Sequence, residues 1–304
     1  MLTGNRTPLA RLREGDGDGF VTSGSELELV REEVVSFVDE AVASANRTGA
    51  VVAMSGGIDS TLTAALAVDA LGSDRVLGLG LPCRKLDEPH ATDARTLAEG
   101  LGIEYREVNL RPLLDAFEDS VAPEISTNGT KRAIGNVVAR LRMACAYYAA
   151  NARSLLVLGT ANRSELLLGY FTKHGDGAAD LYPIGDLYKT EVRALAQRVG
   201  VPRRIINKES TAGLWAGQTD RDDLGAPYET IDALLTRIID RGERVPAAAD
   251  EIGVDEDTAR EIAARYVDTV HKRNVPPTPG LTEDGAGKSA YPLHLLGSGS
   301  TVDP

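Results

Sequence analysis

The chain has 304 residues, a mass of 32.3 kDa, a formal charge of −12 and a sequence pI near 4.9. Its hydrophobic fraction of 42% and charged fraction of 26% are typical of a globular protein and exclude disordered, collagen-like and membrane-spanning chains. The acidic balance argues against nucleic acid as a partner, because phosphate backbones are bound by basic surfaces. The two cysteines cannot form a disulfide framework or a four-ligand zinc site on their own, which favours a reducing cytoplasm.

Both ends of the chain lack hydrophobic periodicity. Residues 1–24 are polar and rich in glycine, without the apolar core of a secretory signal, and we expect them to be a mobile arm. Residues 276–304 are rich in proline, glycine and serine, and we expect a flexible tail. No apolar run approaches the roughly 20 residues that cross a bilayer, so no membrane partner is expected. These features predict one domain over residues 25–275.

Helical and strand patterns alternate through the first half of this domain. Ser25 and Glu28 form a predicted capping box at the start of a helix that ends near Gly49. Strands are predicted over 50–54, 75–81, 104–108 and 154–159, and helices follow them through 71 and over 90–101, 113–121 and 136–152. Strands that alternate with helices form βαβ units, so we predict an α/β fold with a doubly wound parallel sheet and helices on both faces.

The pattern changes after residue 160. Residues 169–186 are rich in loop formers, and helices are predicted over 189–199, 228–239 and 255–271. In an open parallel sheet, ligands bind at the carboxyl ends of the strands. We therefore expect the functional site at the loops that follow Met54 and Gly159.

The most informative local motif is Ser-Gly-Gly-Ile-Asp-Ser over 55–60, between a predicted strand and a predicted helix. Its glycines let the backbone approach an anion, and the helix N-terminus offers free N–H groups to phosphate. Its Asp59 carboxylate suits a Mg²⁺ ion that bridges phosphates. The motif fits neither G-x-x-x-x-G-K-[ST] nor G-x-G-x-x-G, so it is a different phosphate loop. A tight turn capped by Asp and Ser is the structural alternative.

This motif resembles the pyrophosphate loop of the ATP pyrophosphatases, which cleave ATP between its α- and β-phosphates. That superfamily includes GMP synthetase, asparagine synthetase, argininosuccinate synthetase, tRNA-modifying enzymes and NAD⁺ synthetase. Segments 136–143, 158–180 and 208–214 resemble NAD⁺ synthetase, and residues 271–273 resemble its C-terminal substrate contact. The resemblance covers about residues 25–275 and implies the Rossmann-like adenine nucleotide alpha hydrolase fold.

The resemblance implies an ATP site at the motif and at three later positions. The implied ATP-binding residues are Ala53, Met54, Ser55, Gly56, Gly57, Ile58, Asp59, Ser60, Thr160, Lys189 and Thr211. Asp59 and Glu165 are the expected metal ligands, since they face each other if the fourth strand neighbours the first. Glu165 has an alternative role as a solvated acid at a helix start. Lys189 is expected at a helix start, where cations are disfavoured, which is consistent with a reach toward phosphates.

The resemblance also implies a site for deamido-NAD⁺. Its residues are Asn136, Arg140, Lys173, Asp180, His271 and Lys272. Asn136 and Arg140 share a helix face, and a guanidinium binds phosphate or carboxylate oxygens in pairs. Lys173 and Asp180 flank the glycine-rich segment 175–177, which can close over a ligand. His271 and Lys272 have an alternative role as exposed cations at a helix C-terminus.

The implied reaction is the ATP- and Mg²⁺-dependent amidation of deamido-NAD⁺ to NAD⁺. The nicotinate carboxylate attacks the α-phosphorus, pyrophosphate leaves, and ammonia displaces AMP from the acyl adenylate. Glutamine-dependent relatives carry an additional amidase domain that does not fit in the about 25 residues before the first helix, so we expect free ammonia as the nitrogen source. Family members are generally homodimers with the dinucleotide at the subunit interface, and a homodimer is expected here.

Two alternatives stay open at this level. Another pyrophosphate-loop ligase, such as a GMP synthetase or a tRNA-thiolating enzyme, should show a different dimerisation domain, a basic face or redox cysteines. A non-catalytic nucleotide sensor should lack the paired carboxylates of Asp59 and Glu165. Ile58 stands where many relatives have Gln, and Arg84 receives no firm role. The remaining distinctive side chains are expected to be packing residues: Cys83, Cys145 and Trp215.

Overall fold

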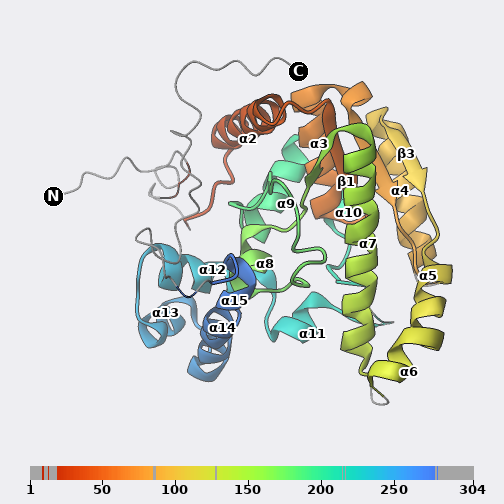
Figure 1. Ribbon diagram of the computed structural model, residues 1–304. Helices are drawn as coiled ribbons and strands as arrows, with labels where there is room; N and C mark the ends of the chain where they lie inside the picture. Colours follow the sequence, from red (N-terminus) through yellow and green to blue (C-terminus); the bar gives the residue numbers. More distant parts are fainter. Residues whose placement is uncertain are drawn as a thin grey trace.

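The computed structural model describes residues 9, 13, 19–84, 87–126, 129–213, 215, 217–277 and 279 (Figure 1). Within them, four parallel strands form one sheet in the order β3-β2-β1-β4. The strands are β1 (Gly49–Ala53), β2 (Val76–Gly80), β3 (Glu104–Glu107) and β4 (Leu155–Leu158). β1 is internal and pairs with β2 from Ala50 opposite Val76, and with β4 from Gly49 opposite Leu155. The predicted α/β class is confirmed.

Helices connect the strands and then form the second half of the chain. The first group is α2 (Gly24–Ser44), α3 (Ile58–Leu71), η1 (Ser73–Arg75), α4 (Glu88–Leu101), α5 (Arg111–Ala116), η3 (Phe117–Val121), α6 (Ala122–Ile125) and α7 (Lys131–Arg153). The second group is α8 (Arg163–Leu168), α9 (Lys189–Arg198), α10 (Arg203–Ile206), α11 (Asp220–Leu224), α12 (Tyr228–Leu235), η4 (Thr236–Asp240), α13 (Val245–Ile252), α14 (Glu256–Asp268) and α15 (Val270–Arg273). No helix in the described part of the chain is long and apolar enough to cross a membrane.

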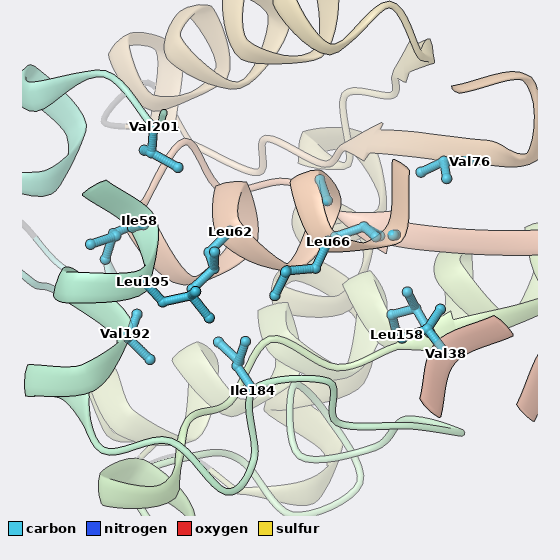
Figure 2. Close-up of a cluster of buried hydrophobic side chains, with 14 of the residues drawn as sticks. Val38, Ile58, Leu62, Leu66, Val76, Leu158, Ile184, Val192, Leu195 and Val201 are labelled. Atoms are coloured by element: carbon cyan, nitrogen blue, oxygen red, sulfur yellow. The ribbon is translucent and has the colours of Figure 1, made fainter. Parts of the chain in front are cut away.

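Successive residues of β1 contribute to hydrophobic clusters on opposite faces of the sheet. Ala50 and Val52 pack with residues of α2, α3, α4 and α9. Figure 2 shows Leu62 of α3 close to Leu195 of α9 within this cluster, which also contains Leu66. Val51 packs instead with residues of α5 and α7. Because helices cover both faces, β1, β2 and β4 are continuously apolar rather than alternating, whereas the edge strand β3 is polar and largely exposed.

The C-terminal helices form a further hydrophobic cluster beside the sheet. Ile231 and Leu235 of α12 pack there with Ala259 and Ile262 of α14 and with Leu168 of α8. Figure 1 shows α12 to α15 gathered on one side of the molecule, far from β3. Because α8 follows β4 directly, this cluster supports the segment that leaves the carboxyl end of the sheet.

The first helix begins two residues before its predicted start. Its N-cap is Ser23, whose Oγ accepts a hydrogen bond of 3.4 Å from the Glu26 N–H. Glu28, the predicted capping partner, forms ion pairs of 2.8 Å with Arg31 and Arg198 instead. The predicted box at Ser25 is therefore wrong, although the predicted helix is present.

Other boundaries also moved, and four short helices were not predicted. α7 begins five residues before the predicted position because Thr130 caps it, with Oγ1 accepting from the Ala133 N–H at 3.1 Å. The predicted helix over 113–121 is part of a longer run formed by α5, η3 and α6. The helices absent from the prediction are α8, α10, α11 and α13, none of which exceeds eight residues.

Part of the predicted mobile arm contacts the domain. Val21 is fully buried, and its N–H donates to Glu191 Oε1 at 3.0 Å. The Arg13 guanidinium donates to the Asp186 carbonyl at 2.7 Å and lies 4.8 Å from the centre of the Tyr188 ring. The packed domain therefore begins before residue 25. Most of residues 1–18, and the predicted tail from residue 280 onward, lie outside the described residues.

Candidate active site

The loops that follow β1 and β4 lie side by side because these two strands pair directly. The chain passes through β2 and β3 before it returns to β4, so the carboxyl ends of β1 and β4 form a topological switch point. A cavity of about 560 Å³ opens there. The predicted site residues that line it are Ala53, Met54, Ser55, Gly57, Ile58, Asp59, Ser60, Asn136, Thr160, Glu165, Lys189, Thr211 and Lys272.

The loop between β1 and α3 turns at Gly56. This residue has φ +71°, and a Cβ atom built on it would lie 2.3 Å from the His90 carbonyl oxygen, so only glycine fits. Gly57 has an ordinary φ of −95° and is the N-cap of α3. Of the two glycines, only Gly56 therefore adopts a conformation that requires glycine. Gly57 has no side chain to cap α3, so the first N–H groups of the helix can bind an anion.

Hydroxyl groups within the loop hold its shape. Ser60 Oγ accepts a hydrogen bond of 3.2 Å from the Ser55 N–H and donates one of 3.2 Å to the Gly57 carbonyl. Thr61 Oγ1 donates to the same carbonyl at 2.7 Å. Ser60 and Thr61 are each 2% exposed, whereas Ser55 is exposed. The buried hydroxyls are thus occupied by the loop itself, and Ser55 is the one accessible to a ligand.

Asp59 and Glu165 converge across the switch point on the ammonium group of Lys189. Lys189 Nζ lies 2.5 Å from Asp59 Oδ2 and 3.5 Å from Glu165 Oε1. The Lys189 side chain is 2% exposed, while those of Asp59 and Glu165 are 18% and 16% exposed. The predicted adjacency of the two carboxylates is confirmed, and the solvated alternative for Glu165 is excluded by its contacts.

Asn162, which the sequence analysis did not single out, aligns both carboxylates. It is fully buried, and its Nδ2 donates to Asp59 Oδ1 at 2.9 Å. Its Oδ1 accepts from the Glu165 N–H at 3.0 Å, and its own N–H donates to Glu165 Oε2 at 3.2 Å. This reciprocal pair is a capping box at the start of α8. The Asn-x-x-Glu spacing was the signal available in the sequence.

The charges of this cluster shift its ionisation. Burial and the nearby Asp59 carboxylate raise the pKa of Glu165 to about 8. Burial disfavours the Lys189 ammonium, but Asp59 and Glu165 outweigh that effect and raise the pKa of Lys189. Burial also raises the pKa of Asp220, whose negative charge acts on both Lys189 and Glu165. The raised pKa of Glu165 shows that one ammonium group does not compensate three carboxyl groups, and a further cation would favour the ionised form of Glu165.

A network of tyrosines and acids borders this cluster. Asp220 is 4% exposed and accepts hydrogen bonds from the hydroxyls of Tyr170 at 3.1 Å and Tyr228 at 3.0 Å. The Tyr228 ring lies 5.1 Å from Lys189 Nζ, within the range of a cation–π contact. Asp220 thereby connects the segment after α8 with the start of α12 and with the ammonium group.

Lys208, for which no role was predicted, also lines the cavity. Its Nζ donates to Asp93 Oδ2 at 2.8 Å and to the Gly56 carbonyl at 3.3 Å. Asp93 also pairs with Arg204 of α10. Lys208 therefore connects the turn of the phosphate loop to α4. Trp215, expected to be a packing residue, also lines the cavity, whereas Cys83 lies in the cluster that contains α7 residues, as expected.

Most of the residues predicted for the dinucleotide meet at the segment after α8. Thr172 Oγ1 donates to Asn136 Oδ1 at 2.9 Å, and Arg140 Nη2 donates to the Lys173 carbonyl at 3.2 Å. Lys173 Nζ donates to the His271 carbonyl at 2.7 Å. In addition, Lys272 Nζ donates to the carbonyls of Gly169 at 2.6 Å and Phe171 at 2.8 Å. These hydrogen bonds bring together α7, this segment and α15. Three of the predicted residues do not line the cavity: Arg140, Lys173 and His271.

Asp180, the remaining residue predicted for the dinucleotide, contacts β4 and α7. Its Oδ2 accepts a hydrogen bond of 2.8 Å from the Val157 N–H of β4, and its Oδ1 accepts one of 3.4 Å from the Tyr147 hydroxyl. Lys173, which flanks the glycine-rich segment on the other side, donates to the His271 carbonyl. Because Asp180 contacts the backbone of a strand, it also fixes the loop against β4.

The donor set at the switch point fits a hard divalent cation only in part. Asp59 and Glu165 offer carboxylate oxygens, which Mg²⁺ prefers, and both point at one position. The described residues contain no cluster of three or more His, Cys, Asp or Glu that would hold a metal ion by itself. Magnesium commonly takes one or two carboxylates and completes its shell with phosphates and water. The two residues therefore fit a metal that arrives with a triphosphate.

Comparison with known proteins agrees with this geometry. Residues 30–276 match the family NAD synthase. The chain is 44% identical over 257 residues to an NH3-dependent NAD⁺ synthetase of Methanosarcina mazei, covering 84% of this chain and 99% of the relative. Two solved structures are similar over most of both chains. An NMN synthetase of Francisella tularensis has a TM-score of 0.71 and 35% sequence identity. The alignment covers 83% of this chain and 98% of the Francisella tularensis chain. An NH3-dependent NAD synthetase of Campylobacter jejuni has a TM-score of 0.68 and 31% sequence identity. The alignment covers 82% of this chain and 97% of the Campylobacter jejuni chain. The chain belongs to the NH3-dependent NAD⁺ synthetase family.

Proposed function

We propose that this ligase converts deamido-NAD⁺, ATP and ammonia into NAD⁺, AMP and pyrophosphate. The observation that carries the proposal is the convergence of Asp59 and Glu165 beside a glycine loop at a helix N-terminus, in a chain of this family. A carboxylate is a poor acyl donor because its leaving group would be oxide. Transfer of AMP to the carboxylate replaces oxide with a good leaving group.

The ATP triphosphate binds at the loop between β1 and α3. Free N–H groups at the start of α3 and the exposed Ser55 hydroxyl supply donors that suit phosphate oxygens. Lys208 is beside the same loop and adds a positive charge. Thr160 and Thr211 line the cavity and contact the nucleoside. Preorganised donors of this kind stabilise the charge that develops as pyrophosphate departs.

Asp59 and Glu165 would hold a Mg²⁺ ion that enters with the triphosphate. When bound, the ion neutralises phosphate charge and stabilises the leaving pyrophosphate. Asn162 keeps the two carboxylates in register, because it contacts both of them while fully buried. Residues that hold metal ligands in place by hydrogen bonds usually affect metal affinity or activity strongly when they are replaced.

The dinucleotide binds along the segment after α8. Arg140 and Lys173 supply the positive charges for its phosphates, while Asn136 is on the same helix face as Arg140 and lines the cavity. His271 and Lys272 hold the segment through α15 and border the same ligand. This arrangement brings the nicotinate carboxylate into the cavity where the α-phosphate is bound.

Two displacements then complete the reaction. A carboxylate oxygen attacks the α-phosphorus, the bond to the bridging oxygen breaks, and pyrophosphate leaves. Ammonia attacks the acyl carbon, loses a proton, and AMP departs with the oxygen that came from the nicotinate. No side chain forms a covalent bond, so catalysis consists of positioning and charge stabilisation.

We also propose a cytoplasmic homodimer with the dinucleotide near the subunit interface. The run from α5 to α7 carries exposed large apolar side chains, which are Leu113, Val121, Ile125 and Tyr148 at 52%, 40%, 76% and 77% exposure. Exposed apolar groups on neighbouring elements are typical of protein interfaces. Sedimentation should give a dimer, and Tyr148→Glu should shift it toward monomer. Leu29→Glu on α2, where the side chain is 52% exposed, should not.

One assay tests the activity. Purified protein is incubated with ATP, Mg²⁺ and ammonium, with either deamido-NAD⁺ or nicotinate mononucleotide as acceptor, and AMP and amide products are measured. The mononucleotide is included because the Francisella tularensis relative is an NMN synthetase. We expect NAD⁺ and AMP in equal amounts, with deamido-NAD⁺ preferred and glutamine unable to replace ammonium. A preference for the mononucleotide, or release of ADP, would reject the proposed substrate or reaction.

A further inference from the structure

The ammonium group of Lys189 occupies the position where the metal ligands converge. It lies 2.5 Å from Asp59 Oδ2 and 3.5 Å from Glu165 Oε1, and its side chain is 2% exposed. Its charge is therefore screened by protein groups and hardly by solvent. Lys189 is the first residue of α9, a helix anchored in the main core through Val192 and Leu195. The packed helix thus fixes the backbone from which the Lys189 side chain extends.

An ammonium and a divalent cation cannot share these oxygens without strong repulsion. Mg²⁺ binds oxygen at about 2.0–2.1 Å, so a metal on Asp59 Oδ2 would lie only a few ångströms from Lys189 Nζ. The site has low solvent exposure, which strengthens that repulsion. A metal can enter only if Lys189 moves away from Asp59.

The surroundings provide a direction for that movement. The Tyr228 ring lies 5.1 Å from Lys189 Nζ, and the phenol is fixed by its 3.0 Å hydrogen bond to Asp220. A triphosphate bound at the start of α3 would offer oxygens in the same cavity that Lys189 and Asp59 line. The ammonium can then pair with phosphate, supported by the ring, while the carboxylates turn to the metal.

Lys208 provides the internal comparison. It is the other lysine beside the phosphate loop, but its Nζ pairs with Asp93 at 2.8 Å rather than with Asp59. Removal of either lysine deletes one positive charge from the same cavity. Only removal of Lys189 leaves Asp59 Oδ2 and Glu165 Oε1 without the ammonium group.

We propose that Lys189 is a positioning residue that occupies the metal position in the nucleotide-free enzyme and yields it only when a triphosphate draws the ammonium away. This inference rests on the proposed metal-binding role of Asp59 and Glu165. The enzyme then binds metal and nucleotide together. A metal ion without nucleotide finds its position occupied by the ammonium group. A triphosphate without metal draws the ammonium group away and leaves the two carboxylates without a cation. Lys189 thereby couples the binding of the two.

The test measures metal affinity in the absence of nucleotide. Mn²⁺, which takes the same oxygen ligands as Mg²⁺, is titrated into purified protein and free Mn²⁺ is followed by electron paramagnetic resonance. We expect weak binding by the wild type, binding at least tenfold tighter by Lys189→Met, and binding within twofold of the wild type by Lys208→Met. Addition of Asp59→Asn to Lys189→Met should abolish the gain.

Each other outcome has a defined meaning. Equal Mn²⁺ affinity in the wild type and Lys189→Met overturns the inference, and so does an equal gain in Lys208→Met. If Lys189→Met does not fold, the double variant Lys189→Met/Glu165→Gln is compared with Glu165→Gln. The double variant removes one carboxylate charge together with the ammonium group, so fewer buried charges are left without a partner. The double variant should again bind at least tenfold tighter, and equal affinities overturn the inference. NAD⁺ formation by the wild type is measured separately, so a failure of the proposed function is distinguished from a failure of this inference.

Discussion

The side chain of Asn162 donates a 2.9 Å hydrogen bond to Asp59, which is 103 positions earlier in the chain. Asn162 is also the N-cap of α8 and accepts from the Glu165 N–H at 3.0 Å. One buried amide thus joins the loop after β1 to the helix after β4. The alignment of the two proposed metal ligands depends on a helix cap, so stability and activity are linked at this residue.

Replacement of Asn162 should separate these two effects. Asn162→Ala removes both the cap and the contact with Asp59, so we expect kcat to fall about 10- to 100-fold, as for outer partners of metal ligands. Loss of an N-cap costs about 1 kcal/mol, which corresponds to a Tm decrease of about 2–4 °C in a chain of this size. Steady-state AMP formation and calorimetry measure the two quantities.

Asn162→Ser provides the matched control. Serine caps helices well, so the Tm should stay near that of the wild type. Its short hydroxyl does not reach Asp59 while capping α8, and the decrease in kcat should persist. Restoration of kcat by serine, or wild-type kcat in Asn162→Ala, would show that the contact with Asp59 has no part in catalysis.

Lys173 should affect one substrate and not the other. It joins the segment after α8 to α15 through the His271 carbonyl and lies outside the cavity assigned to ATP. We expect Lys173→Ala to raise the KM for deamido-NAD⁺ about 10- to 100-fold, the loss of one charge-assisted hydrogen bond. The KM for ATP should stay within about twofold of the wild type.

The control for this variant removes a positive charge elsewhere. Arg47 is exposed just before β1, at the opposite end of the sheet from the cavity. Arg47→Ala should leave both KM values unchanged. Equal increases in the two KM values of Lys173→Ala would indicate a general loss of structure rather than a dinucleotide contact.

Asp232 should make stability depend on pH. It is fully buried and accepts hydrogen bonds of 2.8 Å from the N–H and hydroxyl of Thr190 and one of 2.5 Å from Ser164. Burial raises its pKa from 3.8 to about 6. A raised carboxyl pKa means that the folded state favours the protonated form. Its stabilising contribution is complete below pH 3.8 and is lost as the pH rises through 6.

Asp232→Asn removes this titration. The free energy of unfolding of the wild type, relative to the variant, should fall by about 2.4 kcal/mol between pH 4 and pH 7, because each pKa unit is worth about 1.4 kcal/mol and part of the effect lies below pH 4. Urea unfolding of both proteins across this range measures the difference, since all other groups titrate equally. A constant difference between the two proteins would show that Asp232 does not change its ionisation on folding.

The strands and the phosphate loop could be predicted from the sequence because their signals are local. The apolar runs of β1, β2 and β4, and the Gly-Gly that follows β1, could be recognised without tertiary information. The first helix shows the limit of such signals. Ser23 with Glu26 and Ser25 with Glu28 have the same capping spacing, so the choice between them depends on tertiary ion pairs of Glu28.

The site was predicted less completely because its contacts join distant segments. Glu165 could be paired with Asp59 from the strand order, but the meeting of both at Lys189 required the placement of α9. Lys208 stood in a recognised segment without a role, since its partner Asp93 is 115 positions away. Buried polar networks are specified by tertiary packing and leave no periodic pattern in the sequence.

The most direct test of the account follows one oxygen atom. Deamido-NAD⁺ carrying ¹⁸O in its nicotinate carboxylate is converted with ATP, Mg²⁺ and ammonium, and the AMP is analysed by mass spectrometry. If the carboxylate is adenylylated at the loop between β1 and α3, one labelled oxygen per turnover appears in AMP and none in pyrophosphate. AMP without label, with NAD⁺ still formed, would contradict adenylylation and with it the proposed function of this site.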